Sequence, residues 1–253
     1  MPLTFAHLAA VVPLARLKLP ISALVVGSVA PDLIYFARLA PRGHFGHTLP
    51  GLFLLCLPAG LALLWVFHRL LKGPLTELAP SAAQRRLACY LHASPFDRPL
   101  VLVAAAVLSG AATHDVWDAF THAGGWGVAT ASALRLNVAL GPLGRIPVYK
   151  LAQHGSTLIG LVVLAYSVAA WWRHAPEADT HCHLPARTRK LRLSLLVAVP
   201  LAVGAAYAGG VAVDASAPLT VFVGRFVVSV TSAAFVTATL YSAWCRLRPD
   251  AAG

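Results

Sequence analysis

A long apolar run between residues 49 and 71 constrains this chain more than any other feature of its sequence. The run reads LPGLFLLCLPAGLALLWVFHRLL and stays apolar until His68 and Arg69. An α-helix needs about 20 such residues to cross the hydrocarbon core of a bilayer. Lipid offers the backbone no hydrogen-bond partner, so a spanning segment must be a helix or part of a closed barrel. Because the apolar residues do not alternate with polar ones, we predict a transmembrane helix.

Similar runs recur along the chain. We predict further spans at about 99–121, 156–173, 191–213 and 219–245, and a less distinct membrane segment at 22–39. Only 11% of the residues are charged, whereas a soluble domain carries about 25%. The sequence therefore predicts an all-α, multi-pass transmembrane helix bundle of about five to six membrane segments, and it excludes a soluble globular domain.

The basic residues lie between the predicted spans. In a soluble protein the net charge of +11 would suggest a nucleic-acid partner. Here basic loops at a lipid surface explain it, so we expect membrane lipid as a partner and no nucleic acid. The segments 72–98 and 174–192 and the C-terminal tail are basic, which predicts that they are cytoplasmic and that 40–48 and 122–155 lie outside.

The two parts of the chain differ in polar content. The last two spans, within 191–245, contain no histidine, and Asp214 is their one acidic residue. We therefore divide the chain into a membrane-embedded core, residues 1–175, and a basic loop followed by a two-span hairpin, residues 176–253. Candidate functional residues are expected in the first part.

Ionisable side chains inside apolar segments are the main functional signal. Asp32 lies within VVGSVAPDLIYF, and His114, Asp115 and Asp118 lie within LSGAATHDVWDAFTH. Such a group at membrane depth costs at least about 2.5 kcal/mol, so it is usually partnered and functional. His114 and Asp118 are four residues apart and share a helix face, where they could ligate one metal ion. Asp115 points about 100° away, and we interpret it as separate.

Other histidines lie near the expected ends of the spans. His44 and His47 occur in GHFGHT, and His122 and His154 are expected on the same side of the membrane. His7 would join them if residues 3–39 form two short helices that dip into the membrane and return, with breaks near Pro13 and Pro20. If 22–39 spans fully instead, His7 lies on the opposite side. The purely structural alternatives are that His114 and Asp118 form a hydrogen-bonded pair that holds one helix to another, and that Asp32 caps a short helix.

Five motifs resemble a bacterial membrane family known as domain of unknown function 4184. They are TFAHLAAVVPL, SVAPDLIYF, GHTLPGLFLLCLPAGL, THDVWDAFTHAGGW and PVYKLAQHGST, within residues 2–172. The order of histidines and aspartates more distantly resembles inner-membrane metal-dependent hydrolases regulated by the SOS repressor, and the zinc-dependent phospholipase C and nuclease P1 fold. The chain departs from the phospholipase pattern at Leu158, where that pattern has a glutamate, and it has no N-terminal tryptophan.

The resemblance implies a set of metal ligands and a location in the bacterial cytoplasmic membrane. The candidate ligands to a divalent metal, with zinc as the expected ion, are His7, Asp32, His47, His114, Asp118, His122 and His154. One or two metal ions are expected. Asp32 or Asp118 could be a bridging ligand or a catalytic base, and the sequence leaves both roles open.

These residues favour a metal-dependent membrane hydrolase that acts on a phosphoester or lipid-like substrate. Cationic residues of the glycine-containing stretch after His122 are candidates for binding an anionic headgroup: Arg135, Arg145 and Lys150. The alternative is a non-enzymatic transporter of metal ions or protons, because histidine and aspartate at membrane depth also suit an ion pathway. Haem ligation by paired histidines is a third alternative.

Overall fold

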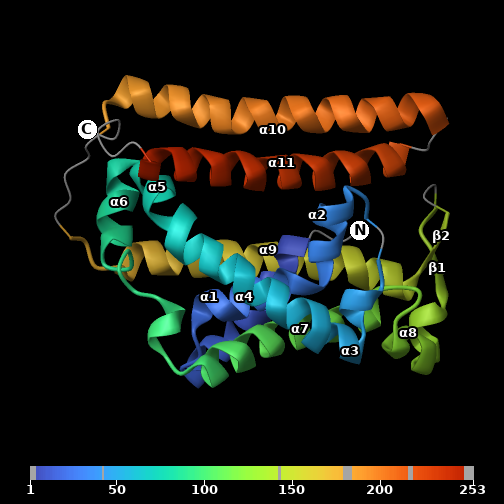
Figure 1. Cartoon of the computed structure of the whole chain (residues 1–253). Coiled ribbons are helices and arrows are strands. Elements are labelled where there is room, and N and C mark those ends of the chain that lie inside the picture. The colour runs from blue at the N-terminus through green and yellow to red at the C-terminus, as the bar shows by residue number, and fades with distance from the viewer. Residues whose placement is uncertain (1–3, 42, 142–143, 179–183, 216–218, 248–253) are drawn as a thin grey trace. The chain divides into compact units, whose positions relative to one another are not determined.

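The computed structural model describes residues 4–41, 43–141, 144–178, 184–215 and 219–247, and this part of the chain is helical apart from one small hairpin (Figure 1). Six of its helical segments are long and apolar enough to cross a membrane. They are Ile21–Arg38, Leu49–Glu77, Leu100–Thr130, Val148–His174, Ala186–Gly210 and Val221–Leu247. The prediction of an all-α, multi-pass transmembrane protein is therefore confirmed.

The contacts divide the chain into two compact units. The first unit consists of Met1–Asp32, His44–Leu61 and Arg98–Arg173, and the second of Leu33–Gly43, Ala62–Asp97 and His174–Gly253. The units are interleaved along the chain, whereas the sequence-based division is a single cut at residue 175. All the candidate site residues named above belong to the first unit.

The chain begins with a helical hairpin in the first unit. Two 3-10 helices, η1 (Thr4–Val11) and η2 (Pro13–Leu17), are followed by a turn at Lys18, whose φ is 58°. The chain then returns through α1 (Ile21–Val29) and the short η3 (Ala30–Asp32), and α1 contacts η1. This fold-back brings His7 close to Asp32 and places the Thr4 hydroxyl 2.6 Å from a carboxylate oxygen of Asp32, while Ile21–Arg38 is also long and apolar enough to span.

The span Leu49–Glu77 contains two π-helical turns, each shortly before a proline. After η4 (Phe45–His47) it comprises α3 (Leu49–Gly51), η5 (Leu52–Cys56), α4 (Leu57–Val66), η6 (Phe67–Leu71) and α5 (Lys72–Glu77). The π turns η5 and η6 precede Pro58 and Pro74. Proline lacks an N–H and clashes with the preceding turn, and local widening of the helix accommodates it within a membrane.

Helices α1 and α7 (Leu100–Thr121) pack closely because each has a glycine at the contact. A Cβ on Gly27 would lie 2.1 Å from the Val107 carbonyl oxygen, and one on Gly110 would lie 2.2 Å from the Leu24 carbonyl oxygen. Small residues allow helix backbones in membranes to approach this closely. The contact aligns the end of α1, and thus Asp32, with the middle of α7.

The stretch after α7 is more ordered than a simple loop. It contains α8 (Trp126–Thr130), η8 (Ser132–Arg135) and the antiparallel strands β1 (Asn137–Ala139) and β2 (Arg145–Pro147), with Val138 opposite Ile146. Helix α9 (Val148–His174) then begins about two turns before the predicted start at 156. The residues between Pro147 and Gly155 contain no helix breaker, which explains the earlier start.

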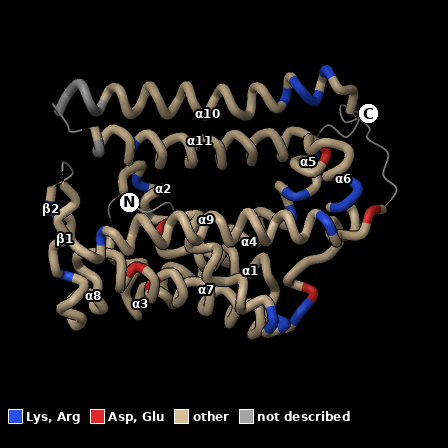
Figure 2. Tube along the Cα trace, turned by 180° about the vertical axis from the view of Figure 1, so that it is seen from behind, with Lys and Arg blue, Asp and Glu red and all other residues tan. Residues whose placement is uncertain are grey.

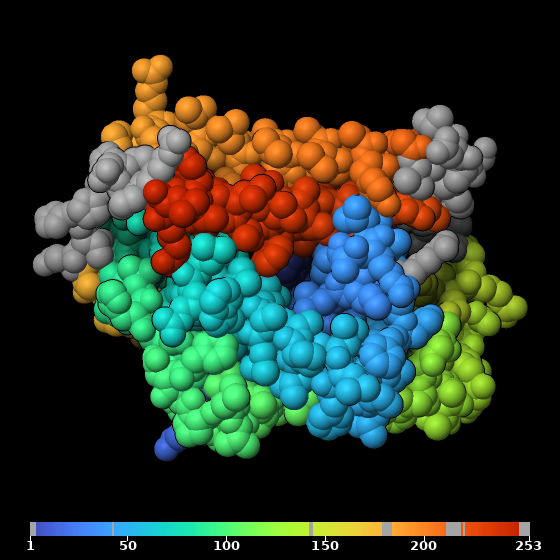
Figure 3. Space-filling view, in the orientation of Figure 1, coloured from blue at the N-terminus to red at the C-terminus, as the bar shows by residue number. Residues whose placement is uncertain are grey.

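The second unit is built around a long helical pair. Helices α10 (Ala186–Ala215) and α11 (Leu219–Leu247) lie side by side (Figure 3). Gly204 of α10 lies against Val230 of α11. The Ser232 hydroxyl of α11 donates a hydrogen bond to the Phe36 carbonyl of α2 (Leu33–Arg38). The other elements of this unit after α5 are α6 (Ser81–Ala88) and η7 (Pro95–Asp97).

Many charged residues of the second unit lie near helix ends, although Arg225 lies within the apolar sequence of α11. Lys and Arg lie in the first turns of α10 and in α6 (Figure 2). Arg85 and Arg86 of α6 form ion pairs with Glu177 at 2.9 and 2.6 Å. His181, Cys182 and His183 lie outside the described residues.

We expect Gly110→Val to destabilise the protein, because its side chain would overlap the α1 backbone. Overpacking a tight contact typically costs about 1–3 kcal/mol, and the lost stability can be measured by thermal unfolding in detergent. Gly155→Ala is the matched control, since a Cβ there meets nothing within 4 Å. It should be neutral or slightly stabilising in helix α9. Equal stability of Gly110→Val and the wild type would contradict the close contact.

Candidate metal centre

Histidines and aspartates from four elements meet inside the first unit. They come from η1, η3, η4 and α7. Their potential ligand atoms form two groups, and within each group all of these atoms lie within 4.8 Å of one another. One group is His7, His114 and Asp118, and the other is Asp32, His47 and His114. Of the seven ligands that the sequence proposed, the structure thus groups five, and His122 and His154 belong to neither group.

His114 is common to both groups and is completely buried. Its Nδ1 lies 2.8 Å from the Ser28 carbonyl oxygen. Because a carbonyl only accepts, Nδ1 must carry the proton and Nε2 presents its lone pair. That Nε2 has no hydrogen-bond partner. It faces Asp118 Oδ2 at 3.5 Å and Asp32 Oδ1 at 3.8 Å.

His7 repeats this arrangement on the neighbouring element. Its Nδ1 donates to the Thr4 carbonyl at 3.2 Å, and its Nε2 lies 2.9 Å from Asp118 Oδ1. The rings of His7 and His114 stack with centroids 4.1 Å apart. Because a carboxylate only accepts, the 2.9 Å contact between His7 and Asp118 requires a proton on His7 Nε2 when no metal ion is bound. A metal ion would take the place of that proton and use the same nitrogen as a ligand.

His47 lies between two carboxylates. Its Nε2 is 3.4 Å from Asp32 Oδ1, and its Nδ1 is 3.1 Å from Asp115 Oδ1. The neighbouring Thr48 caps α3, accepting a hydrogen bond from the Gly51 N–H at 3.0 Å. Gly46 lies against the Pro31 backbone, where a Cβ would meet the carbonyl oxygen at 2.3 Å. These contacts fix η4 against η3.

The position of Asp115 differs from the sequence interpretation, which separated it from the site. Helical spacing does turn Asp115 away from Asp118, but η4 approaches α7 on that side and brings His47 to it. A carboxylate on the far nitrogen of a ligating histidine orients the ring and increases its basicity. No signal in the sequence of α7 alone reveals this contact, because it depends on where η4 packs.

The donor set fits a divalent metal ion. Two ligands at about 2.0–2.1 Å around a tetrahedral ion lie about 3.3 Å apart, close to the 3.4 and 3.5 Å separations of His47–Asp32 and His114–Asp118. Nε2 of His114 has a single lone pair and can bind only one ion. The two groups therefore share their central ligand, which favours one ion surrounded by both.

The charges of the cluster are also compatible with a bound cation. Among the described residues, each ion-pair contact of Asp32, Asp115 and Asp118 is with a histidine, and none is with lysine or arginine. Burial lowers the pKa of His47, but its hydrogen bonds with Asp115 and Asp32 and the charges of both carboxylates outweigh burial and raise the pKa to about 10. Without a metal, protons on histidine must balance the carboxylates.

The remaining predicted ligands lie at the edge of the cluster or outside it. His122 contacts Asp118 Oδ1 through Nδ1 at 3.2 Å but belongs to neither ligand group. His154 is exposed and has no contact with the cluster, and His44 is also exposed. The preceding residue, Gln153, is buried and contacts His122 instead. Nothing in the sequence singles out Gln153, since an uncharged amide is no signal of a functional site.

The three predicted substrate-binding cations are all exposed and lie between α8 and the first turn of α9. Arg135 ends η8, Arg145 begins β2, and Lys150 lies in α9. Lys150 donates to the Gln153 side-chain oxygen at 3.1 Å. Within the described residues, Arg135 and Arg145 make no ion pair, so they are available to an anionic ligand.

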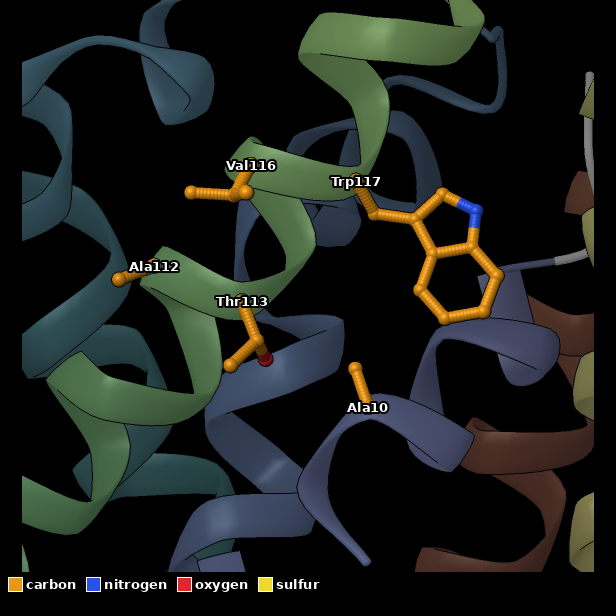
Figure 4. A pocket seen from close by; sticks show the side chains of 5 residues that line it. All are labelled: Ala10, Ala112, Thr113, Val116 and Trp117. Carbon is orange, nitrogen blue, oxygen red and sulfur yellow. The ribbon is translucent and has the colours of Figure 1, made fainter. Parts of the chain in front are cut away.

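An open apolar pocket adjoins the cluster. Ala10 of η1 and Thr113 and Trp117 of α7 face the same space, and Ala112 and Val116 complete the lining (Figure 4). The indole of Trp117 also contacts the His7 ring, with centroids 5.3 Å apart. Trp117 therefore lies between the histidine–aspartate cluster and the apolar pocket.

The raised pKa of His47 predicts a pH effect in chelator-treated protein. A pKa raised from 6.5 to about 10 stabilises the fold fully below pH 6.5, and this stabilisation is lost as pH rises through about 10. NMR titration of the His47 ring in detergent should show a midpoint near the upper value. Asp115→Asn should lower that midpoint and Asp97→Asn should not. A midpoint insensitive to Asp115→Asn would contradict the contact.

Comparison with known proteins gives a family without an assigned activity. A family model described as a domain of unknown function matches residues 1–243. No curated protein and no solved structure matches the chain. The matched region includes the whole histidine–aspartate cluster and nearly all of α11. The chain therefore belongs to the family of domain of unknown function 4184.

Proposed function

We propose that the first unit binds one divalent metal ion, with zinc as the expected ion, through His7, Asp32, His47, His114 and Asp118. The observation that carries this proposal is the buried Nε2 of His114, which has no hydrogen-bond partner and faces two carboxylates. Imidazole nitrogens and carboxylate oxygens are ligands that zinc prefers. The hydrogen bonds of His7 and His114 to backbone carbonyls are the outer-shell contacts that metal-ligating histidines normally make.

We further propose that this centre belongs to a hydrolase. A bound zinc ion would lower the pKa of a coordinated water and polarise the scissile group. Both aspartates are proposed ligands, and Asp118 is the better candidate to act as a base as well, because its side chain is 17% exposed whereas that of Asp32 is 7% exposed. Asp32 accepts the short hydrogen bond from Thr4 and is better suited to a fixed ligand role.

A phosphoester with a lipid-like tail is the substrate class that the surroundings favour. The apolar pocket begins at Trp117, beside His7, and is lined by η1 and by α7, which belongs to a segment long and apolar enough to span a membrane. Arg135 and Arg145 are exposed cations that could hold an anionic headgroup. We place the protein in the bacterial cytoplasmic membrane with its C-terminus inside, from the basic segments that follow the positive-inside rule.

The metal content of purified protein tests the proposed centre. We expect one zinc ion per chain after purification without chelator, measured by elemental analysis. His114→Ala and Asp118→Ala should each lose the ion, because they remove the shared ligand or the carboxylate that contacts three histidines. Phosphoesterase activity should disappear in parallel.

His154→Ala provides the control for this experiment. Because His154 is exposed and outside the cluster, the variant should keep both the metal and the activity. Full occupancy in His114→Ala would refute the centre. Bound metal with no turnover, accompanied by metal or proton flux in liposomes, would replace the hydrolase with the transporter alternative.

Filling the apolar pocket tests the substrate class. Ala112→Trp should lower kcat/KM for a long-chain lipid phosphoester by about tenfold or more, since one or two lost methylene contacts already change specificity by that order. Hydrolysis of a short, water-soluble phosphoester by the same variant should be unchanged. Parallel loss on both substrates would show that the pocket does not receive a substrate chain.

A further inference from the structure

A hydrogen-bonded chain links the surface of α9 to the candidate metal centre. Lys150 Nζ lies 3.1 Å from Gln153 Oε1, and Gln153 Nε2 lies 3.1 Å from His122 Nε2. His122 Nδ1 in turn lies 3.2 Å from Asp118 Oδ1. Lys150 is exposed, whereas the Gln153 side chain is 2% exposed. A buried amide that bridges an exposed lysine and a histidine beside the centre has a defined orientation.

Lys150 determines which way the Gln153 amide points. An ammonium group only donates hydrogen bonds, so the atom of Gln153 that faces it must be the oxygen. The amide NH2 group must then face His122 Nε2. Because the amide nitrogen donates, His122 Nε2 must accept, and the proton of the neutral imidazole is on Nδ1.

The opposite side of the His122 ring leads independently to the same tautomer. The Thr121 hydroxyl lies 3.3 Å from His122 Nδ1, and it donates its single proton to the Trp117 carbonyl at 3.0 Å. Its oxygen can therefore only accept from Nδ1. Asp118 Oδ1 also accepts at this nitrogen. Thr121 and Asp118 thus require a proton on Nδ1, and Gln153 requires a lone pair on Nε2, so all three contacts fit the same tautomer.

We propose that Lys150 and Gln153 are positioning residues that hold His122 as the Nδ1–H tautomer, so that His122 orients Asp118 instead of binding the metal. Both nitrogens of His122 are occupied by these contacts, which leaves no lone pair for an ion. Asp118 Oδ1 contacts His122 Nδ1 at 3.2 Å as well as His7 Nε2 at 2.9 Å, and Asp118 Oδ2 faces His114 Nε2. The tautomer of His122 is inferred from the distances alone, whereas the expected effect on metal affinity rests on the proposed function.

Histidine NMR tests the tautomer directly. The full-length protein, labelled with 13C and 15N at histidine and kept in detergent with chelator, should show His122 as the Nδ1–H form, identified by the signals that His122→Asn removes. Lys150→Met and Gln153→Leu should shift His122 toward the Nε2–H form. Lys150→Arg, which keeps a donor, should preserve the wild-type tautomer. Gln153→Glu, whose side chain only accepts, should move the proton to Nε2.

Metal affinity supplies the second readout. Removing an outer-shell contact typically weakens metal binding about 10- to 100-fold, so His122→Asn, Lys150→Met and Gln153→Leu should bind zinc more weakly but still bind one ion. Complete loss in His122→Asn, as in His114→Ala, would make His122 a ligand and overturn the proposal. An unchanged tautomer in both Lys150→Met and Gln153→Leu would also overturn it.

The two readouts separate this proposal from the proposed function. If the tautomer responds as expected but no variant and no wild-type protein binds zinc, the hydrogen-bonded chain is upheld and the metal centre is refuted. If zinc binds normally while the His122 tautomer is the Nε2–H form in the wild type, the centre is upheld and the positioning role is refuted.

Discussion

The close contact between α1 and α7 is the constraint on which the rest of the first unit depends. Gly27 and Gly110 let the two backbones approach until the Ser28 carbonyl reaches His114 Nδ1 at 2.8 Å. That single hydrogen bond fixes the tautomer of His114 and directs its Nε2 toward Asp32 and Asp118. If the helices were separated by the width of an alanine methyl group, the bond would lengthen and the central histidine would lose its orientation. Packing of small residues thus determines the chemistry of the cluster.

The same packing brings carboxylates together, and without a cation this costs folding free energy. Three carboxylates lie near one another with histidines as their ion-pair partners, and ionisable groups at membrane depth are costly. Protons on histidine can balance part of this charge, as the raised pKa of His47 indicates. A divalent ion would balance more of this negative charge, and it would bind several of the oxygens and nitrogens at once. Folding and metal binding are therefore expected to stabilise each other.

The sequence was sufficient for the spans and for most of the cluster, because both leave strong signals. Long apolar runs are required by lipid, and an aspartate such as Asp32 inside one is too costly to be incidental. Asp115 and Gln153 were not predictable in the same way. Asp115 joins the site only because η4 approaches α7 from a second side, and Gln153 is a neutral residue beside the more conspicuous His154. The interleaving of the two units likewise depends on long-range contacts that no local pattern encodes.

The fixed tautomers also distinguish between the candidate functions. A histidine that relays protons must release a proton from one nitrogen and accept one at the other. In His7 and His114, Nδ1 is bound to the carbonyls of Thr4 and Ser28, so relay would break a buried hydrogen bond in each cycle. A metal ligand needs the opposite property, namely one nitrogen locked as a donor and the other held as a directed lone pair. The geometry of these two histidines therefore favours a stationary metal centre over a proton pathway.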